Sequence, residues 1–135
     1  MIAIDTSAMI AILRPEPEAA AYSSVIAADQ GSCMSAVCLQ EASFVLAGRN
    51  GSEKAWEDLD DFIRAMEVQV VPHDLRLALI ARAAFLTFGK GRHPAGLNLA
   101  DCASYALAKA RSIPLLFKGA DFARTDVVPA HATPA

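Results

Sequence analysis

Apolar and polar positions follow one another in short blocks along this chain. Met1–Ile4 is an unbroken apolar run, and Asp5, Thr6 and Ser7 come directly after it. A run of this length is too short for an isolated helix but suits a strand that is buried on both faces of a parallel sheet. Such a strand brings the next residue to the carboxyl edge of the sheet, where open α/β folds bind ligands.

The later blocks predict alternating strands and helices. The other expected strands are Ser32–Ser35, Glu67–Val71, Ile113–Phe117 and a last short one at Val127-Val128. The expected helices are Ser7–Arg14, Glu18–Gln30, Ala36–Ala47, Glu53–Met66, Leu75–Phe88 and Leu99–Ala110, with a turn at Asn50-Gly51. This alternation predicts an α/β fold of three layers, α/β/α, around a central parallel sheet of four or five strands. We expect a single domain over residues 1–130 and a frayed tail over residues 131–135.

The composition indicates more apolar surface than one small domain buries. Hydrophobic residues make up 54% of the 135 residues, compared with roughly 45–50% in typical globular domains. The pattern at Leu75–Phe88 is apolar around most of the helix, which is typical of a helix that is buried or lies in a subunit interface. We therefore expect self-association or a protein partner.

Nothing at the N-terminus predicts a membrane span or a signal peptide, since Asp5 interrupts the apolar run and no basic residue precedes it. The cysteines are Cys33, Cys38 and Cys102, an odd number without a C-x-x-C pair. They are typical of reduced, partly buried thiols in a cytoplasmic protein.

Charge is distributed unevenly between the two halves of the chain. Residues 1–67 hold 4 basic and 11 acidic residues, whereas residues 68–135 hold 8 basic and 4 acidic ones. The net charge of −3 argues against a protein that coats nucleic acid generally. The asymmetry can still accommodate a polyanion on one face.

Four acids stand at positions where an ordinary solvated charge is not expected. Asp5 follows the first strand, Asp101 begins a helix, Asp121 follows an expected strand, and Glu41 has apolar helical neighbours (Val37, Cys38, Phe44 and Val45). Each has a simpler explanation. Asp5 can cap a helix, Asp101 can form a capping box with Asn98, Asp121 can belong to a turn, and Glu41 can reach solvent from the edge of its stripe.

Together the four acids predict a cation site. The carboxyl ends of parallel strands and the helix starts after them share one edge of the sheet, so these acids should gather there. Clustered carboxylates raise one another's pKa and stay ionised when a cation lies among them. Hard oxygen ligands favour Mg²⁺ or Mn²⁺ over zinc, and such ions activate water for hydrolysis at phosphorus. The hydroxyls of Ser7 and Thr6 could orient Asp5 or the water, or simply cap the helix.

The histidines form no competing site. His73 and His131 are interpreted as incidental, whereas His93 lies with Lys90 and Arg92 in a basic loop, Gly89–Gly96. That loop either contacts a phosphate or is a plain exposed loop.

Four segments together resemble the PIN-domain ribonucleases, and more closely the VapC-type toxins of toxin–antitoxin pairs. They are MIAIDTSAMIAIL at the start, Ser35–Ala42, Leu97–Ala108 and Leu115–Asp126, and they span nearly the whole chain in the family's order and spacing. In Leu97–Leu99 the sequence has Leu where relatives often carry an aromatic residue before the Asp, a departure that does not affect the chemistry.

The resemblance implies an endoribonuclease that depends on Mg²⁺ or Mn²⁺ and cleaves a specific structured RNA by a metal-activated water. It implies the metal carboxylates Asp5, Glu41, Asp101 and Asp121, with Ser7 at the family's hydroxyl position and Asp126 as an acid further from the metal. It also implies a homodimer and a cognate antitoxin that covers or enters the acidic pocket. Lys90, Arg92, His93 and Lys118 are the residues we expect to contact RNA.

Two other functions were weighed against this one. A phosphatase of the haloacid dehalogenase kind also begins with a strand and an Asp, but it needs a second acid two residues later, where this chain has Ser7. A catalytically silent PIN-like module that binds a protein or RNA partner is the alternative from another class, and the presence of all four acids argues against it.

Overall fold

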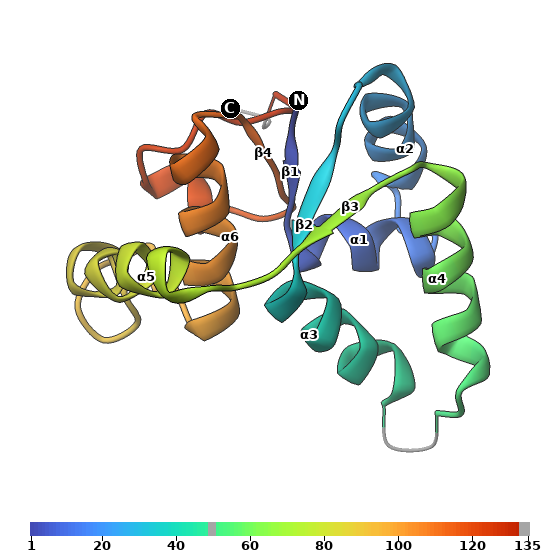
Figure 1. Cartoon of the computed structure of the whole chain (residues 1–135), viewed down its shortest axis with the longest axis horizontal. Helices are drawn as coiled ribbons and strands as arrows, with labels where there is room; N and C mark the ends of the chain where they lie inside the picture. Colours follow the sequence, from blue (N-terminus) through green and yellow to red (C-terminus); the bar gives the residue numbers. More distant parts are fainter. Residues whose placement is uncertain (49–50, 133–135) are drawn as a thin grey trace.

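The computed structural model describes residues 1–48 and 51–132 (Figure 1). The helices are α1 (Thr6–Leu13), α2 (Ala19–Ala28), α3 (Ala36–Ala47), α4 (Lys54–Ala65), α5 (Leu75–Phe88) and α6 (Leu99–Arg111), with a 3₁₀ turn, η1 (Phe122–Arg124). The strands are β1 (Ala3–Ile4), β2 (Cys33–Ser35), β3 (Gln69–Val71) and β4 (Leu115–Leu116). Arg49 and Asn50 lie outside the described residues, as do residues 133–135.

The predicted parallel sheet is confirmed, and among the described residues it has four strands. Their order is β3-β2-β1-β4, and every pair is parallel. Ala3 of β1 is in register with Cys33 of β2 on one side and with Leu115 of β4 on the other. The first strand is therefore central, as an unbroken apolar run predicts.

The predicted strand at Val127-Val128 is wrong. The chain makes only an isolated parallel bridge there, between Leu115 and Pro129, in which the Leu115 amide donates to the Val128 carbonyl at 2.8 Å. The Ala130 amide donates back to the Leu115 carbonyl at 2.9 Å, and among the described residues this segment and β4 form no further pair.

The sheet divides the interior into two apolar clusters because successive strand residues point to opposite faces. Ala3, Cys33 and Leu115 pack against α5 and α6 on one face. Ile4, Met34 and Leu116 pack against α1, α2, α3 and α4 on the other face. Figure 1 shows these two groups of helices on either side of the strands, and the three predicted layers are confirmed.

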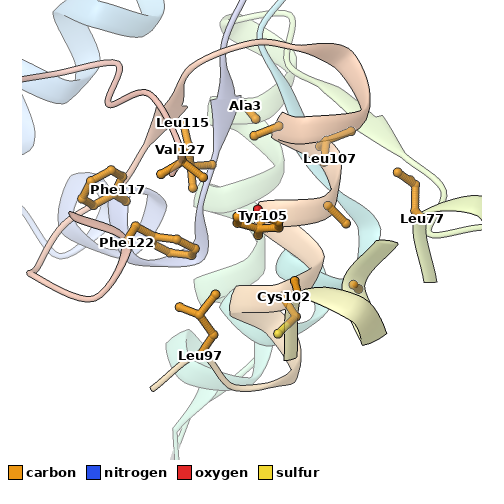
Figure 2. Packing of buried hydrophobic residues seen from close by; sticks show 14 of the residues in the cluster. Ala3, Leu77, Leu97, Cys102, Tyr105, Leu107, Leu115, Phe117, Phe122 and Val127 are labelled. Atoms are coloured by element: carbon orange, nitrogen blue, oxygen red, sulfur yellow. The ribbon is translucent and has the colours of Figure 1, made fainter. Parts of the chain in front are cut away.

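The cluster beneath α5 and α6 also takes in the segment after β4 (Figure 2). Tyr105, Phe117, Phe122 and Val127 are buried within it. The rings of Phe117 and Phe122 lie 5.4 Å apart between centroids. This packing fixes the chain on both sides of Lys118–Asp121, the loop that follows β4.

Helix α5 buries one side in the core, and its exposed side also carries large apolar residues. Its buried residues are Leu77, Ala81 and Ala84, whereas Leu75, Leu79, Phe85 and Leu86 are exposed. An apolar face of this kind is typical of an interface.

No helix in the described part of the chain is long and apolar enough to cross a membrane. Cys33, Cys38 and Cys102 are all free and buried, as the sequence predicts.

The strands are short, and helices start almost directly after them. Asp5 alone separates β1 from α1, and Ser35 at the end of β2 is itself the N-cap of α3. Helices α1, α3 and α6 contact one another in pairs, and Figure 1 shows α1 and α3 starting at the end of the sheet where β1 and β2 finish. Residues at these helix starts are therefore brought together.

Candidate active site

Asp5 is the buried centre of this edge of the sheet. Its side chain is 2% exposed, and it caps α1 by accepting a hydrogen bond from the Ser7 amide at 3.0 Å. Burial raises the pKa of Asp5 above its usual value, and hydrogen bonds from Ser104 and Ser7 oppose that rise. The predicted capping role of Asp5 is confirmed. Capping α1 does not prevent the Asp5 carboxylate from also binding a cation.

Ser7 links Asp5 to the end of β4. The Ser7 hydroxyl donates to Asp5 Oδ2 at 2.6 Å and accepts from the Lys118 amide at 3.0 Å. The chain is therefore held to Asp5 immediately after β4, which brings the loop that carries Asp121 to the same edge.

Ser104 is a site residue that sequence reasoning missed. It lies on α6 and is 2% exposed, and its hydroxyl donates to Asp5 Oδ1 at 2.5 Å. In the sequence it is a small polar residue in an Ala-rich helix, a position that carries little signal. Its spacing of three residues after Asp101, on the same helical face, is the pattern that could have found it.

Asp101 stands at the start of α6 in the capping box that was considered for it. Its amide donates to Asn98 Oδ1 at 2.9 Å, and its Oδ2 accepts from the Asn98 amide at 3.0 Å. Desolvation by burial raises the pKa of Asp101 to about 6, and the charges of Asp5, Glu41 and Asp121 add to the rise. Asp5, Glu41 and Asp121 therefore lie near enough to Asp101 for their charges to act on its carboxyl.

Glu41 lies near this carboxyl, but the expectation that it sits in a stripe facing the core is wrong. Helix α3 buries only Cys38 and Ala42, whereas Phe44 is 65% exposed. Glu41 is half-buried and lines a hollow of about 450 Å³ between α3 and the start of α6, together with Phe44, Asn98 and Leu99. Its charge therefore reaches solvent, which a core position would not allow.

The two acids after β4 have different surroundings. Asp121 is exposed at the start of η1 and makes no capping hydrogen bond. Asp126 instead accepts from the Tyr105 hydroxyl at 2.6 Å and from the Lys109 ammonium at 2.9 Å, along the second half of α6. Asp126 is thus held away from the start of α6, where Asp101 lies.

The remaining predicted residues divide between packing and surface. Thr6 does not orient Asp5 through its hydroxyl, which contacts the Cys38 carbonyl on α3 at 3.4 Å. The His93 ring packs edge-on against Phe88, and its Nδ1 accepts from the Ala95 amide at 3.0 Å. Lys90 and Arg92 are exposed, with the Arg92 guanidinium 5.8 Å from the centre of the Phe85 ring.

Lys118 is less available than the sequence predicts. Its ammonium lies 2.9 Å from Glu16 and 3.1 Å from Glu18, which precede α2. Hydrogen bonds to these two carboxylates raise the pKa of Lys118, and Glu16 has the larger effect. Its side chain is therefore already neutralised within the chain.

The donor set fits a hard divalent cation in its chemistry, because Asp5, Glu41, Asp101 and Asp121 offer only oxygen. Within residues 1–48 and 51–132, no group of three or more His, Cys, Asp or Glu side chains is arranged so that it could hold a metal ion. Both oxygens of Asp5 and one of Asp101 instead accept hydrogen bonds within the chain. Side chains would have to turn toward an ion for three of them to bind it.

Among protein families, the PIN domain matches residues 2–128 of the chain. The chain is 44% identical over 128 residues to "Ribonuclease VapC" of Mycolicibacterium smegmatis, which covers 95% of this chain and 98% of that protein.

Solved structures with the same fold share little sequence. The toxin VapC20 of Mycobacterium tuberculosis, described as cleaving the sarcin-ricin loop, has a TM-score of 0.74 at 20% identity and covers 95% of this chain and 97% of its own. The VapBC2 complex of Rickettsia felis, bound to a DNA fragment from its promoter, has a TM-score of 0.72 at 16% identity, with 96% of each chain covered.

Proposed function

We propose an active site for this chain, which belongs to the PIN-domain family as a VapC-type toxin with endoribonuclease activity. In this proposal the carboxylates that cleave RNA are those of Asp5, Glu41, Asp101 and Asp121. One observation carries the proposal. Burial raises the pKa of Asp101 to about 6, and the charges of Asp5, Glu41 and Asp121 add to the rise, which supports a site in which the four acids act together. Clustered carboxylates with perturbed pKa values are typical of functional sites.

The proposal includes Mg²⁺ or Mn²⁺ held by these four carboxylates. When bound, such an ion activates water and stabilises the charge that develops at phosphorus during phosphodiester hydrolysis. The chain's own contribution is to hold Asp5 in a fixed orientation and to keep Asp101, Glu41 and Asp121 beside it at the surface.

The proposed substrate is a specific structured RNA, and the proposed contacts to it are Lys90 and Arg92, with His93 supporting the loop from within. Arg124 ties this loop to η1 by donating to the Pro94 carbonyl at 3.0 Å, so the basic loop lies beside the segment that starts at Asp121. Cationic side chains next to an acidic centre hold phosphates that flank the cleaved bond. Lys118 contributes less, because Glu16 and Glu18 already bind it.

The proposed protein partner is a cognate antitoxin that covers the acidic site. The hollow beside Glu41 supports this, because it places the Glu41 carboxylate next to the exposed apolar side chains of Phe44 and Leu99, and Leu99 is 78% exposed. A partner segment with apolar and basic side chains would match both features.

We also propose a homodimer in the cytoplasm, supported by the exposed apolar face of α5 and by the three free thiols. Light scattering at micromolar concentration should give twice the mass of the chain, and the mass of one chain would contradict the dimer.

RNA cleavage with Mg²⁺ or Mn²⁺, with and without chelator, tests the enzymatic proposal. We expect cleavage by the wild type to stop on chelation and to be lost in Asp5→Asn. Cleavage that survives both changes would exclude this site. The silent alternative predicts RNA or partner binding without cleavage under every condition, and the presence of all four acids in the sequence argues against it.

A further inference from the structure

Ser104 is a buried hydroxyl in the middle of a helix whose neighbouring residues are all buried. It is 2% exposed, and Ala103 and Tyr105 on either side of it are buried as well. A hydroxyl in such surroundings costs free energy unless it is hydrogen-bonded. Its partners therefore show what the position is for.

The Ser104 hydroxyl lies between one acceptor, Asp5, and one thiol, Cys38. Its Oγ lies 2.5 Å from Asp5 Oδ1 and 3.0 Å from Cys38 Sγ. An ionised carboxylate can only accept, so the single Ser104 proton is directed to Asp5. Toward Cys38 the Ser104 oxygen can then only accept, and the single proton of the Cys38 thiol has the Ala100 carbonyl, at 3.6 Å, as a second and more distant acceptor.

Cys38 is suited to this donor role. Burial raises the pKa of its thiol to about 12, so the sulfur keeps its proton at neutral pH. A thiol in α3 thus supports a hydroxyl in α6, which in turn supports the acid after β1.

The result is that both oxygens of Asp5 are held from opposite sides. The Ser7 amide and hydroxyl bind Oδ2, and the Ser104 hydroxyl binds Oδ1. The carboxylate cannot turn about its own axis without losing one of these bonds. Ser104 is also three residues after Asp101, so one rigid helix carries Asp101 and the group that orients Asp5.

We propose that Ser104 is a positioning residue for Asp5, with the Cys38 thiol fixing the Ser104 hydroxyl from behind. This inference rests on the proposed function, in which Asp5 is a ligand of a divalent cation. A hydroxyl that only satisfied packing would contribute to stability, and its removal would leave cation affinity and turnover unchanged.

The test is Ser104→Ala, examined first without RNA. We expect Mn²⁺ binding, measured by isothermal titration calorimetry, to weaken by about 10- to 100-fold, as when an outer partner of a metal ligand is removed. In RNA cleavage at saturating Mn²⁺ we expect kcat to fall and KM for RNA to stay the same, because Ser104 is buried and does not reach the substrate.

Ser43→Ala is the matched control. It removes a hydroxyl from α3 that bonds the Leu39 carbonyl at 2.8 Å, within its own helix. We expect wild-type Mn²⁺ affinity and kcat for this variant. Wild-type values for Ser104→Ala as well would overturn the inference.

A second pair of variants examines the thiol. Cys38→Ala should weaken Mn²⁺ binding by a smaller factor than Ser104→Ala, since Ser104 keeps its own bond to Asp5. Cys102→Ala removes a buried thiol of α6 that contacts the other apolar cluster, and it should leave Mn²⁺ affinity unchanged. Equal effects of the two cysteine variants would contradict the role of Cys38.

If Ser104→Ala does not fold, Ser104→Cys takes its place, because it fills similar space with a weaker donor. Its Mn²⁺ affinity and kcat should be below those of the wild type, and wild-type values would overturn the inference. The outcomes separate the two proposals. If the wild type neither binds Mn²⁺ nor needs Asp5, the proposed function fails. If the wild type needs both and Ser104→Ala is normal, only this inference fails.

Discussion

Helices α1 and α6 both begin with a side-chain cap, but the cap of α1 is buried and that of α6 is partly exposed. Each helix is capped by residues that include an acid, Asp5 for α1 and Asp101 with Asn98 for α6. Asp5 is 2% exposed and accepts from Ser7 and Ser104 through both oxygens. Asp101 is half-buried, and its recorded hydrogen bond, from the Asn98 amide, uses only Oδ2.

This difference assigns separate roles to two acids of one site. Asp5 is a fixed anchor, since its environment leaves it one orientation. Asp101 is adjustable, since an oxygen is left over and its pKa of about 6 lies within reach of ordinary pH changes. In the proposed cation site, a rigid carboxylate would order the site before the cation binds, and an adjustable one would complete the coordination afterwards.

Replacing each acid by its amide should separate the two roles most clearly. Asp5→Asn leaves one carbonyl oxygen for donors on both sides, so a buried donor loses its partner at a cost of about 1–3 kcal/mol. Asp101→Asn keeps an oxygen for the Asn98 amide, so no buried donor loses its partner and the free energy of unfolding should not fall. RNA cleavage should fall in both variants by at least about 100-fold.

Urea unfolding followed by circular dichroism measures these stabilities. Asp74→Asn is the control, because Asp74 caps α5 by accepting from the Leu77 amide at 3.0 Å and belongs to no acidic cluster. It should keep wild-type cleavage. A loss of stability in Asp101→Asn as large as that in Asp5→Asn would break the comparison.

The pH dependence of stability should identify Asp101 as the adjustable acid. Its pKa is about 6 in the folded chain against a usual value of 3.8, so the folded state binds this proton more tightly. The resulting stabilisation is complete below the unfolded pKa and is lost as the pH rises through 6. After allowance for solvent screening, the loss between pH 4 and pH 7 should be about 1–2 kcal/mol.

This change is measured by urea unfolding in chelator across that range of pH. In Asp101→Asn the same increment should be missing, so the variant gains on the wild type as the pH rises. Parallel curves for the two proteins would show that Asp101 titrates normally.

Removing the cap of α6 should have the smallest effect. Asn98→Ala deletes the acceptor for the Asp101 amide and should lower the free energy of unfolding by about 1 kcal/mol. Asp74→Ala deletes the equivalent acceptor on α5 and should cost about the same. Cleavage should decrease only in Asn98→Ala, and an equal decrease in both would mean that the cap of α6 does not serve the site.

Much of the fold follows from local pattern, because the strands are short and helices begin next to them. Asp5 could be found from an apolar run that ends in an acid, and the sheet does place that run at its centre. The strand prediction at Val127-Val128 was wrong because β-branched residues favour strands in general, whereas this segment pairs with β4 only through the single bridge between Leu115 and Pro129.

The interior of the site could not be predicted so directly. Ser104 and Asp5 are 99 residues apart, and nothing around Ser104 in the sequence marks it as the partner of an acid. The sequence selects Glu41 because its helical neighbours are apolar, which predicts that this side of the helix faces the core. Apolar neighbours indicate the core only if the helix packs on that side. Phe44 instead faces outward beside the hollow, where interface residues are expected.

Two backbone hydrogen bonds close the base of the basic loop, Gly89–Gly96, and they indicate where the chain can accept additional residues. The Lys90 amide bonds the Leu97 carbonyl at 3.0 Å, and the Leu97 amide bonds the Phe88 carbonyl at 3.0 Å. Residues inserted between Lys90 and Arg92, which are exposed, would enlarge the loop and leave both of these hydrogen bonds in place. One residue inserted between Asp101 and Ser104 would turn Ser104 by about 100° around α6 and away from Asp5.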